Sequence, residues 1–354
     1  MPIIIEPRVR GVLETEAAED IAVQAAAAER QGEWDTAAGL YARTFRSALQ
    51  EGWTERAADA LRGQARIRQQ QGRYEEAEEL AELSRELAER NGLAQAVARA
   101  LNILGIIRYS RQDWAGAESF YRAALEKALD LGDDELVGLA CQNLGVLANV
   151  KGDLREARSR YLESVGSFVR SGSTFNAMMA YNNLGMAATD LQEWMEAEVY
   201  YSRGIEIAER LSHAQLTGML YSNLAEPLIH VGELQRARDS LAVAEEAATQ
   251  VGDAATLADI SRFRGIIARE QGDLDLAESF LQRALESSGP PDLERAKTLR
   301  ELARLHRARG RRADAVRAYR SAGALYHAFG AHAYAQAMED EVRELEEGTE
   351  AERR

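Results

Sequence analysis

The side chains that most often carry catalysis are few in this sequence, and their spacing does not suit it. The five histidines are His213, His230, His306, His327 and His332, and the one cysteine is Cys141. His327 and His332 are five residues apart, which does not place both on one face of a helix. The sequence also lacks Cys/His metal spacing, a phosphate-binding glycine loop and a dinucleotide fingerprint. It therefore predicts a protein without enzymatic activity, metal or cofactor.

Composition indicates the cellular compartment and excludes some classes of partner. A single cysteine excludes an internal disulfide and suits a reducing compartment. The first residues contain only the short apolar run Ile3–Ile5, which is too short for a signal peptide or a membrane span. The net charge of -15 argues against nucleic acid as a partner. We expect a cytoplasmic protein with no membrane association.

One set of landmarks recurs along the whole chain. Residues 142–161, QNLGVLANVKGDLREARSRY, carry a small residue, Gly145, that is followed twelve residues later by Ala157. Equivalent small residues lie at Ala25, Ala65, Gly105, Gly145, Gly185, Ala225, Gly265 and Ala303, with six spacings of 40 residues and one of 38. The residue twelve positions on is alanine in every copy. A period in this range is typical of a helical repeat array.

Each repeat divides into two helical segments. The first copy predicts helices over residues 16–30 and 34–50, and Gly52 then follows as a left-handed C-cap residue would. The same stop recurs at Gly92, Gly132, Gly172 and Gly252, with Ser212 in the equivalent place of the fifth copy. Each repeat is therefore predicted to be a pair of helices of about seventeen residues.

These residues carry a family resemblance. The segment GIIRYSRQDWAGAESFYRAAL, starting at Gly105, resembles a tetratricopeptide repeat, and the likeness covers residues 15–329 in eight copies. The longer unit with Asn-Leu-Gly in its first helix is similar to the repeats of kinesin light chain, of the LGN scaffold and of the Rap-type peptide sensors. The resemblance implies an all-α, right-handed solenoid whose concave face, lined by the first helices, binds extended peptides or partner proteins.

Four segments follow from this assignment. Residues 1–14 are expected to be an extended or disordered arm, with a self-associating arm as the alternative, and residues 15–330 form the eight repeats. Residues 331–347 are expected to form a capping helix with Ala333, Ala337, Val342 and Leu345 on its apolar side. Residues 348–354 are expected to fray.

The resemblance also selects the residues of the inner face. Those of repeats three to six are amide-rich and Met-rich: Asn102, Ile106, Tyr109, Gln142, Asn143, Val146, Asn149, Met179, Asn182, Asn183, Met186, Met219, Ser222, Asn223 and His230. Amides can pair with the backbone of an extended peptide, and methionine adapts to irregular apolar shapes. The alternatives are that the Asn residues bridge neighbouring repeats and that the Met residues fill the core.

Arginines flank this amide-rich group. They are Arg62, Arg66 and Arg99 on one side and Arg262, Arg269, Arg300, Arg304 and Arg307 on the other. Arginine binds carboxylates through paired hydrogen bonds, so these residues predict a ligand with acidic groups. The alternative is a solvated face, or pairing with Glu residues of the same helices.

Pro227 interrupts the first helix of the sixth repeat. It removes a backbone hydrogen bond and predicts a kink, while Glu226 adds a negative charge to the expected inner face. The pair is either a local change of curvature or a hinge or specificity element.

The leading functional prediction is a protein-protein interaction scaffold that binds an extended peptide or partner protein in its concave groove. The alternative is a peptide-gated regulator resembling the Rap-type sensors; with about fourteen residues before the first repeat, its effector would be a separate protein. A third hypothesis, nucleic-acid binding through the terminal arginines, would show as salt-dependent binding.

Overall fold

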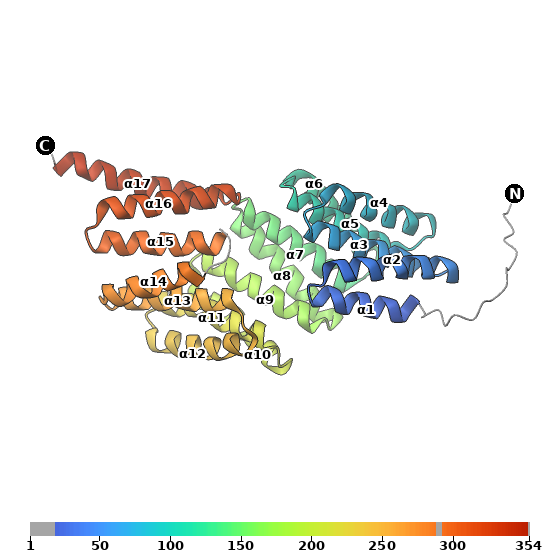
Figure 1. The fold of residues 1–354 in the computed structure, drawn as a ribbon, viewed down its shortest axis with the longest axis horizontal. Helices are drawn as coiled ribbons and strands as arrows, with labels where there is room; N and C mark the ends of the chain where they lie inside the picture. Colours follow the sequence, from blue (N-terminus) through green and yellow to red (C-terminus); the bar gives the residue numbers. More distant parts are fainter. Residues whose placement is uncertain (1–17, 288–291, 353–354) are drawn as a thin grey trace, which may run out of the picture. The chain divides into compact units, whose positions relative to one another are not determined.

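The computed structural model describes residues 18–287 and 292–352, and side chains up to residue 347. Within these ranges the chain forms seventeen α-helices and no strand (Figure 1). They are eight successive pairs and one further helix, which confirms the predicted all-α array of eight hairpins and a terminal helix. The predicted arm, residues 1–14, lies outside the described residues. The chain divides into two compact units, residues 1–136 and 137–354, and each is described by itself.

The first unit holds three helix pairs and the beginning of a fourth. Its helices are α1 (Ala18–Arg30), α2 (Trp34–Glu51), α3 (Thr54–Gln70), α4 (Tyr74–Arg90), α5 (Ala94–Ser110) and α6 (Trp114–Leu131). Helix α7 (Asp134–Val150) contains the boundary between the units. From α1 to α6 each helix packs on the next, and α3 contacts both α1 and α5, so the first helices of these pairs form one layer.

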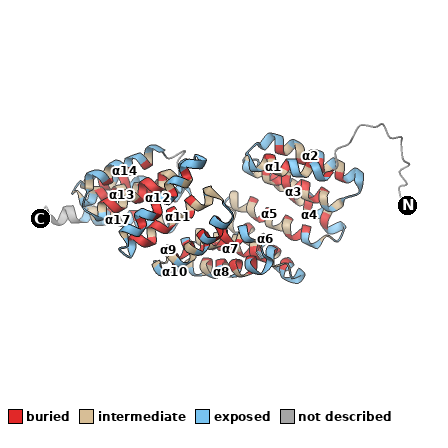
Figure 2. Ribbon diagram, turned by 90° about the horizontal axis from the view of Figure 1, so that it is seen from below, coloured by how far each residue is buried: buried red, intermediate tan, exposed pale blue. Residues whose placement is uncertain are grey.

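The second unit continues the same pattern. Its helices are α8 (Leu154–Ser171), α9 (Thr174–Asp190), α10 (Trp194–Arg210), α11 (Ala214–His230), α12 (Leu234–Val251), α13 (Ala254–Glu270), α14 (Leu274–Ser287), α15 (Leu293–Ala308), α16 (Arg312–Ala328) and α17 (His332–Glu352). The first helices α9, α11, α13 and α15 contact one another in sequence. A continuous apolar core runs from Ala148 to Ile267 through these repeats, and the buried residues line the helix faces that meet neighbouring helices (Figure 2).

The helix ends follow the predicted stops. Gly52 has φ of 75° and its backbone N–H donates to the last turn of α2, which is a left-handed C-cap. Ser212, which replaces glycine in the fifth copy, takes the same left-handed region with φ of 51°. The residue after the stop is the N-cap of the next helix, as where Asp253 accepts a hydrogen bond from the Thr256 N–H over 3.2 Å. Local turn chemistry therefore fixes the forty-residue unit.

The landmark residues are the tightest contacts between paired helices. A Cβ placed on Gly145 would lie 2.6 Å from the ring of Tyr161, sixteen residues later on α8, and Gly185 meets Tyr201 in the same way. Ala157 and Ala197, on the second helices, are fully buried. The small residue on the first helix therefore makes room for the aromatic ring of the second, and the periodic alanine lets the two backbones approach.

Helix α17 covers the end of the array with a different face from the one expected. Ala335, Met338 and Val342 are its buried residues, whereas Ala333 and Ala337 are exposed. Residues 335, 338 and 342 lie three and four positions apart, so they share one stripe of the helix. The prediction was wrong for the two alanines because their weak apolar signal did not distinguish the stripe. The helix also continues past residue 347, to Glu352.

Helix α11 passes through Pro227 without ending. The helix runs from Ala214 to His230, and Pro227 is buried in its last turn. Among the described helices, none is long and apolar enough to cross a membrane.

Candidate functional site

The second unit encloses a cavity of about 670 Å³. The first helices α7, α9, α11, α13 and α15 supply most of its wall, and α10, α16 and α17 complete it. Nine of the inner-face and flanking residues selected from the sequence line it: Asn149, Asn182, Met186, Met219, Asn223, His230, Arg262, Arg300 and Arg304. The periodicity therefore brings together side chains that are up to 155 residues apart in the chain.

One wall of the cavity is built from amides and methionines. The Asn223 side chain donates to Oδ1 of Asn182 over 2.9 Å, and the Asn182 amide contacts Sδ of Met186 at 3.6 Å. Asn182 is buried, whereas Asn223 is half-buried and Met186 is exposed. Asn182 thus joins two neighbouring repeats, as the alternative interpretation of the Asn residues predicted. The Asn149 and Asn223 side chains leave amide groups accessible from the cavity.

The opposite wall carries a network of charges between α13 and α15. Arg262, almost fully buried, forms ion pairs with Asp259 at 2.7 Å and with Glu294 at 3.3 Å. Lys297 binds Glu294 at 2.7 Å. Burial raises the pKa of Asp259 to about 6. Although burial opposes it, Lys297 and Arg262 hold the pKa of Glu294 at about 2. The network neutralises its own charges.

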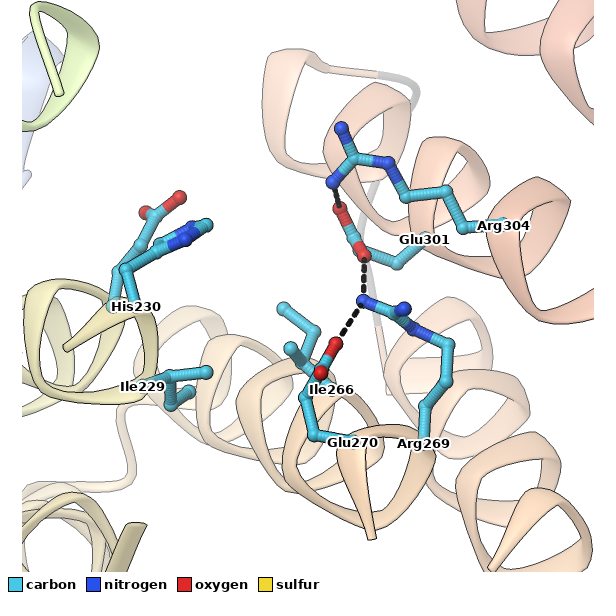
Figure 3. A pocket seen from close by; sticks show the side chains of 8 residues that line it. Ile229, His230, Ile266, Arg269, Glu270, Glu301 and Arg304 are labelled. Carbon is cyan, nitrogen blue, oxygen red and sulfur yellow. Dashed lines mark hydrogen bonds and ion pairs between the residues drawn. The ribbon is translucent and has the colours of Figure 1, made fainter. Parts of the chain in front are cut away.

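A second network surrounds Glu301, whose side chain is 2% exposed. It binds Arg304 at 2.7 Å, Arg300 at 3.3 Å and Arg269 at 3.5 Å, and Arg269 also binds Glu270 at 3.0 Å. Figure 3 shows the ion pairs that Arg304 and Arg269 form with Glu301 and Glu270 on one side of a smaller pocket, with His230 and Ile229 on the other side. This pocket has a volume of about 150 Å³ and adjoins the larger cavity, since Glu226, His230 and Arg304 line both.

These networks change the interpretation of the arginines. Arg262, Arg269, Arg300 and Arg304 each bind a carboxylate of this chain, and Arg307 binds Glu341 and Glu344. In the first unit, Arg66 donates to both carboxylate oxygens of Glu29 over 2.8 Å, and Arg62 pairs with Asp59. Arg99 is half-buried in α5. Most of the predicted ligand-binding arginines thus bind carboxylates of the protein. Glu301 lies on the same helix as Arg300 and Arg304, as the alternative expected, whereas Arg66 and Arg307 bind carboxylates of other helices.

The remaining predicted residues lie apart from the cavity of the second unit. Ser222 is 1% exposed and is packed inside the array. The other residues are half-buried without lining the cavity: Asn102, Ile106 and Tyr109 in the first unit, and Gln142, Asn143, Val146, Met179 and Asn183 in the second. Tyr109 packs edge to face on Trp114 with ring centroids 5.3 Å apart. Consecutive residues of an α-helix point in directions about 100° apart. Asn182 therefore lines the cavity, whereas its neighbour Asn183 does not.

Several lining residues, among them Trp194, Tyr326 and Tyr334, were not selected from the sequence, although His230 was. The ring of Trp194 stacks on His230 with centroids 4.0 Å apart and planes 6° from parallel. Tyr326 stacks on Tyr334 at 5.3 Å, and the Tyr334 hydroxyl donates to Oδ1 of Asp190 over 2.6 Å. Burial raises the pKa of Asp190, whereas the hydrogen bond that the carboxylate accepts from Tyr334 lowers it. Asp259 and Glu294 could have been found as carboxylates three residues before the cations Arg262 and Lys297. No sequence pattern joins Tyr334 to Asp190.

Within the described residues, no group of three His, Cys, Asp or Glu side chains is arranged to hold a metal ion. Burial raises the pKa of Cys141 to about 12, so this thiol is not an activated nucleophile. The chemistry that the cavity offers is hydrogen bonding, ion pairing and apolar contact.

Solved structures share this fold. The signal-transduction ATPase with a tetratricopeptide repeat sensor from Pyrococcus horikoshii superposes with a TM-score of 0.63 at 16% identity, over 93% of this chain and 50% of that one. A Rap protein in complex with Competence and Sporulation Factor gives 0.56 at 13% identity, over 95% and 99% of the two chains. The Rap conjugation gene regulator in complex with a Phr peptide gives 0.55 at 18% identity, over 76% and 73%. At these identities the likeness shows the fold alone.

Sequence families agree with the geometry. A comparison with curated proteins gives no match. Four models described as tetratricopeptide repeat match residues 23–91, 100–135, 178–212 and 256–327, which together are more than half of the chain. With the repeat period, the helix pairs and the small-residue contacts, these matches identify the chain as a member of the tetratricopeptide repeat family.

Proposed function

We propose that the protein is a non-enzymatic interaction scaffold that binds an extended peptide, or a peptide segment of a partner protein, in the cavity of its second unit. The observation that carries the proposal is the cavity itself, about 670 Å³ and lined by five successive first helices. Pockets of about 300–1,000 Å³ are the usual size for small ligands. A short extended peptide fits this range.

The amide and methionine wall suits such a ligand. Asn149 and Asn223 offer amide donors and acceptors to a peptide backbone, and Met186 and Met219 offer adaptable apolar contact. The likeness to a Rap regulator in complex with a Phr peptide adds support, because that protein has the same fold. The engaged arginines give less support to the expected acidic ligand than the sequence did.

A degenerate peptide library tests the proposal. The full chain is immobilised and exposed to random octapeptides with an acetylated N-terminus and an amidated C-terminus, and the retained pool is quantified and sequenced. We expect retention with preferences at several positions. The double variant Asn149→Ala, Asn223→Ala should lose at least five-fold in retention.

The matched control replaces amides that lie elsewhere. The double variant Asn183→Ala, Asn102→Ala changes two asparagines of first helices that do not line the cavity. It should retain peptides as the unchanged protein does. If the unchanged protein retains no peptide, or if both double variants lose retention equally, the cavity is not the binding site. Circular dichroism of each variant checks that helicity is preserved.

A peptide-gated regulator is the second candidate, favoured by one contact. Asp190 and Tyr334 both line the cavity and bind each other, so a bound peptide would touch the contact that joins α9 to α17. In this case the retained peptide pool should change hydrogen exchange at the start of α17. If hydrogen exchange at the start of α17 is the same with and without peptide, the regulator is excluded and the interaction scaffold remains.

A further inference from the structure

The charges that line the cavity and its adjoining pocket do not balance. The six acidic residues are Asp190, Glu226, Asp259, Glu270, Glu294 and Glu301. The five basic residues are Arg262, Arg269, Lys297, Arg300 and Arg304. The lining therefore holds one more carboxylate than it holds Arg and Lys side chains. The partners of each group show which carboxylate is left without a bond.

Every one of the five cations is bound to a carboxylate of the lining. Arg262 and Lys297 bind Asp259 and Glu294, and the three other arginines bind Glu301, with Glu270 as a further partner of Arg269. Asp190 accepts the hydrogen bond of Tyr334. Five of the six carboxylates therefore have a hydrogen-bond or ion-pair partner.

Glu226 is the remaining carboxylate. In residues 18–287 and 292–347, its side chain has no hydrogen bond and no ion pair within 4.0 Å. The negative charge of Glu226 acts on Arg262 and Arg300. Burial lowers the pKa of each guanidinium, but the surrounding carboxylates, including Glu226, raise both pKa values above the ordinary value for arginine. Both arginines are nevertheless bound to other carboxylates. Glu226 thus lies at the wall shared by both spaces without a cation of its own.

The position of Glu226 suits recognition of an extended ligand. It lies four residues before His230 on α11, between the amide wall of α9 and the charged wall of α15. The stacked pair of Trp194 and His230 is next to it along the cavity lining, and an aromatic face attracts a guanidinium or ammonium group. A carboxylate in a partly enclosed cavity is stabilised most by a cation that arrives with its own apolar stem.

We propose that the Glu226 carboxylate binds a Lys or Arg side chain of the peptide, so that the ligand of this cavity is basic rather than acidic. This inference rests on the proposed peptide binding and specifies its charge. The acidic ligand predicted from the arginines is the opposite choice, and it would require an anion to displace Glu301 or Glu294 from cations that they already hold.

The blocked octapeptide library separates the two choices, because its members carry no terminal charges. With the unchanged protein we expect Arg and Lys to be enriched at least three-fold at one position or more. Glu226→Gln should keep the other preferences and lose this enrichment, and Glu226→Lys should replace it with Asp or Glu. Glu270→Gln, which changes an acidic lining residue already bound to Arg269, is the matched control and should keep the enrichment.

The outcomes distinguish the two levels of the proposal. No retained peptide at all contradicts the proposed function. Retained peptides without Arg or Lys enrichment, or an enrichment that survives in Glu226→Gln, overturn the role of Glu226 and leave peptide binding intact. Equal losses in Glu226→Gln and Glu270→Gln would show a response to total charge and would also overturn it.

Discussion

The hydroxyl of Tyr334 donates a hydrogen bond to Oδ1 of Asp190 over 2.6 Å, although 144 residues separate the two in the chain. The contact joins the first turn of α17 to the last residue of α9 and is the longest in sequence among the side-chain hydrogen bonds of the second unit described above. It also places both side chains in the wall of the cavity.

Tyr334→Phe should destabilise the second unit by about 1–2 kcal/mol, because Asp190 loses its donor in a partly buried place. Denaturant unfolding followed by circular dichroism measures the change. Tyr221→Phe is the matched control, since Tyr221 also donates to a carboxylate, Glu209, over 2.8 Å, but at an exposed place. It should cost no more than about 0.5 kcal/mol. Equal effects of the two variants would contradict a special role of the Tyr334 contact.

Gly185→Ala should destabilise the fold by about 1–3 kcal/mol, because its Cβ would lie 2.6 Å from the Tyr201 ring. Gly39→Ala serves as the comparison: it is also in a helix, and nothing lies within 4 Å of its added Cβ. That change should stabilise by about 0.5–1 kcal/mol through helix propensity. Thermal midpoints give the direction of each. A rise of the midpoint in Gly185→Ala would disprove the close contact.

Glu301→Gln should cost about 3 kcal/mol, because it leaves Arg269, Arg300 and Arg304 without their shared carboxylate. Glu270→Gln removes an exposed partner of Arg269 and should cost less than about 1 kcal/mol. The free energies of unfolding of both variants decide the matter. A Glu301 variant as stable as the Glu270 variant would mean that the arginines are satisfied by solvent.

The pH dependence of Asp259→Asn follows from the sign of its pKa shift. Burial raises the folded pKa of Asp259 to about 6, above the ordinary value of about 3.9. The folded state therefore binds the proton more tightly, and the contribution of this carboxyl to stability falls as the pH rises from about 4 to 6. Asn cannot ionise, so the variant should gain about 1–2 kcal/mol relative to the unchanged protein between pH 4 and pH 7.

Denaturant unfolding at pH 4, 5, 6 and 7 measures this gain. A difference for Asp259→Asn that stays constant, or falls with rising pH, would show that Asp259 is ionised throughout the range.

Much of the fold could be predicted because the same local interactions recur in each of the eight repeats. Gly145 and Ala157 recur for packing reasons, and Gly52 and its equivalents end helices by backbone conformation. Each of these effects acts within one helix pair. The sequence spacing therefore reports them directly.

The site was less predictable because it depends on contacts between repeats. Asn182 and Asn183 both matched the inner-face register, and only the rotation of α9 against its neighbours decides which one lines the cavity. The arginines were expected to bind carboxylates of a ligand. Instead, Arg66 binds Glu29, 37 residues away in the chain, and Arg269 binds Glu301, 32 residues away. Periodicity places residues on a face, but it does not tell which opposite charges meet across helices.

The bond between Tyr334 and Asp190 has a consequence for how the second unit unfolds. In a linear repeat array each unit contacts only its neighbours, so the last helix can detach first and the loss then spreads inward. Here the last helix is also tied to α9, several repeats earlier. Fraying from the carboxyl end must break this link as well as the local packing, so the second unit gains cooperativity that a chain of nearest-neighbour contacts would lack.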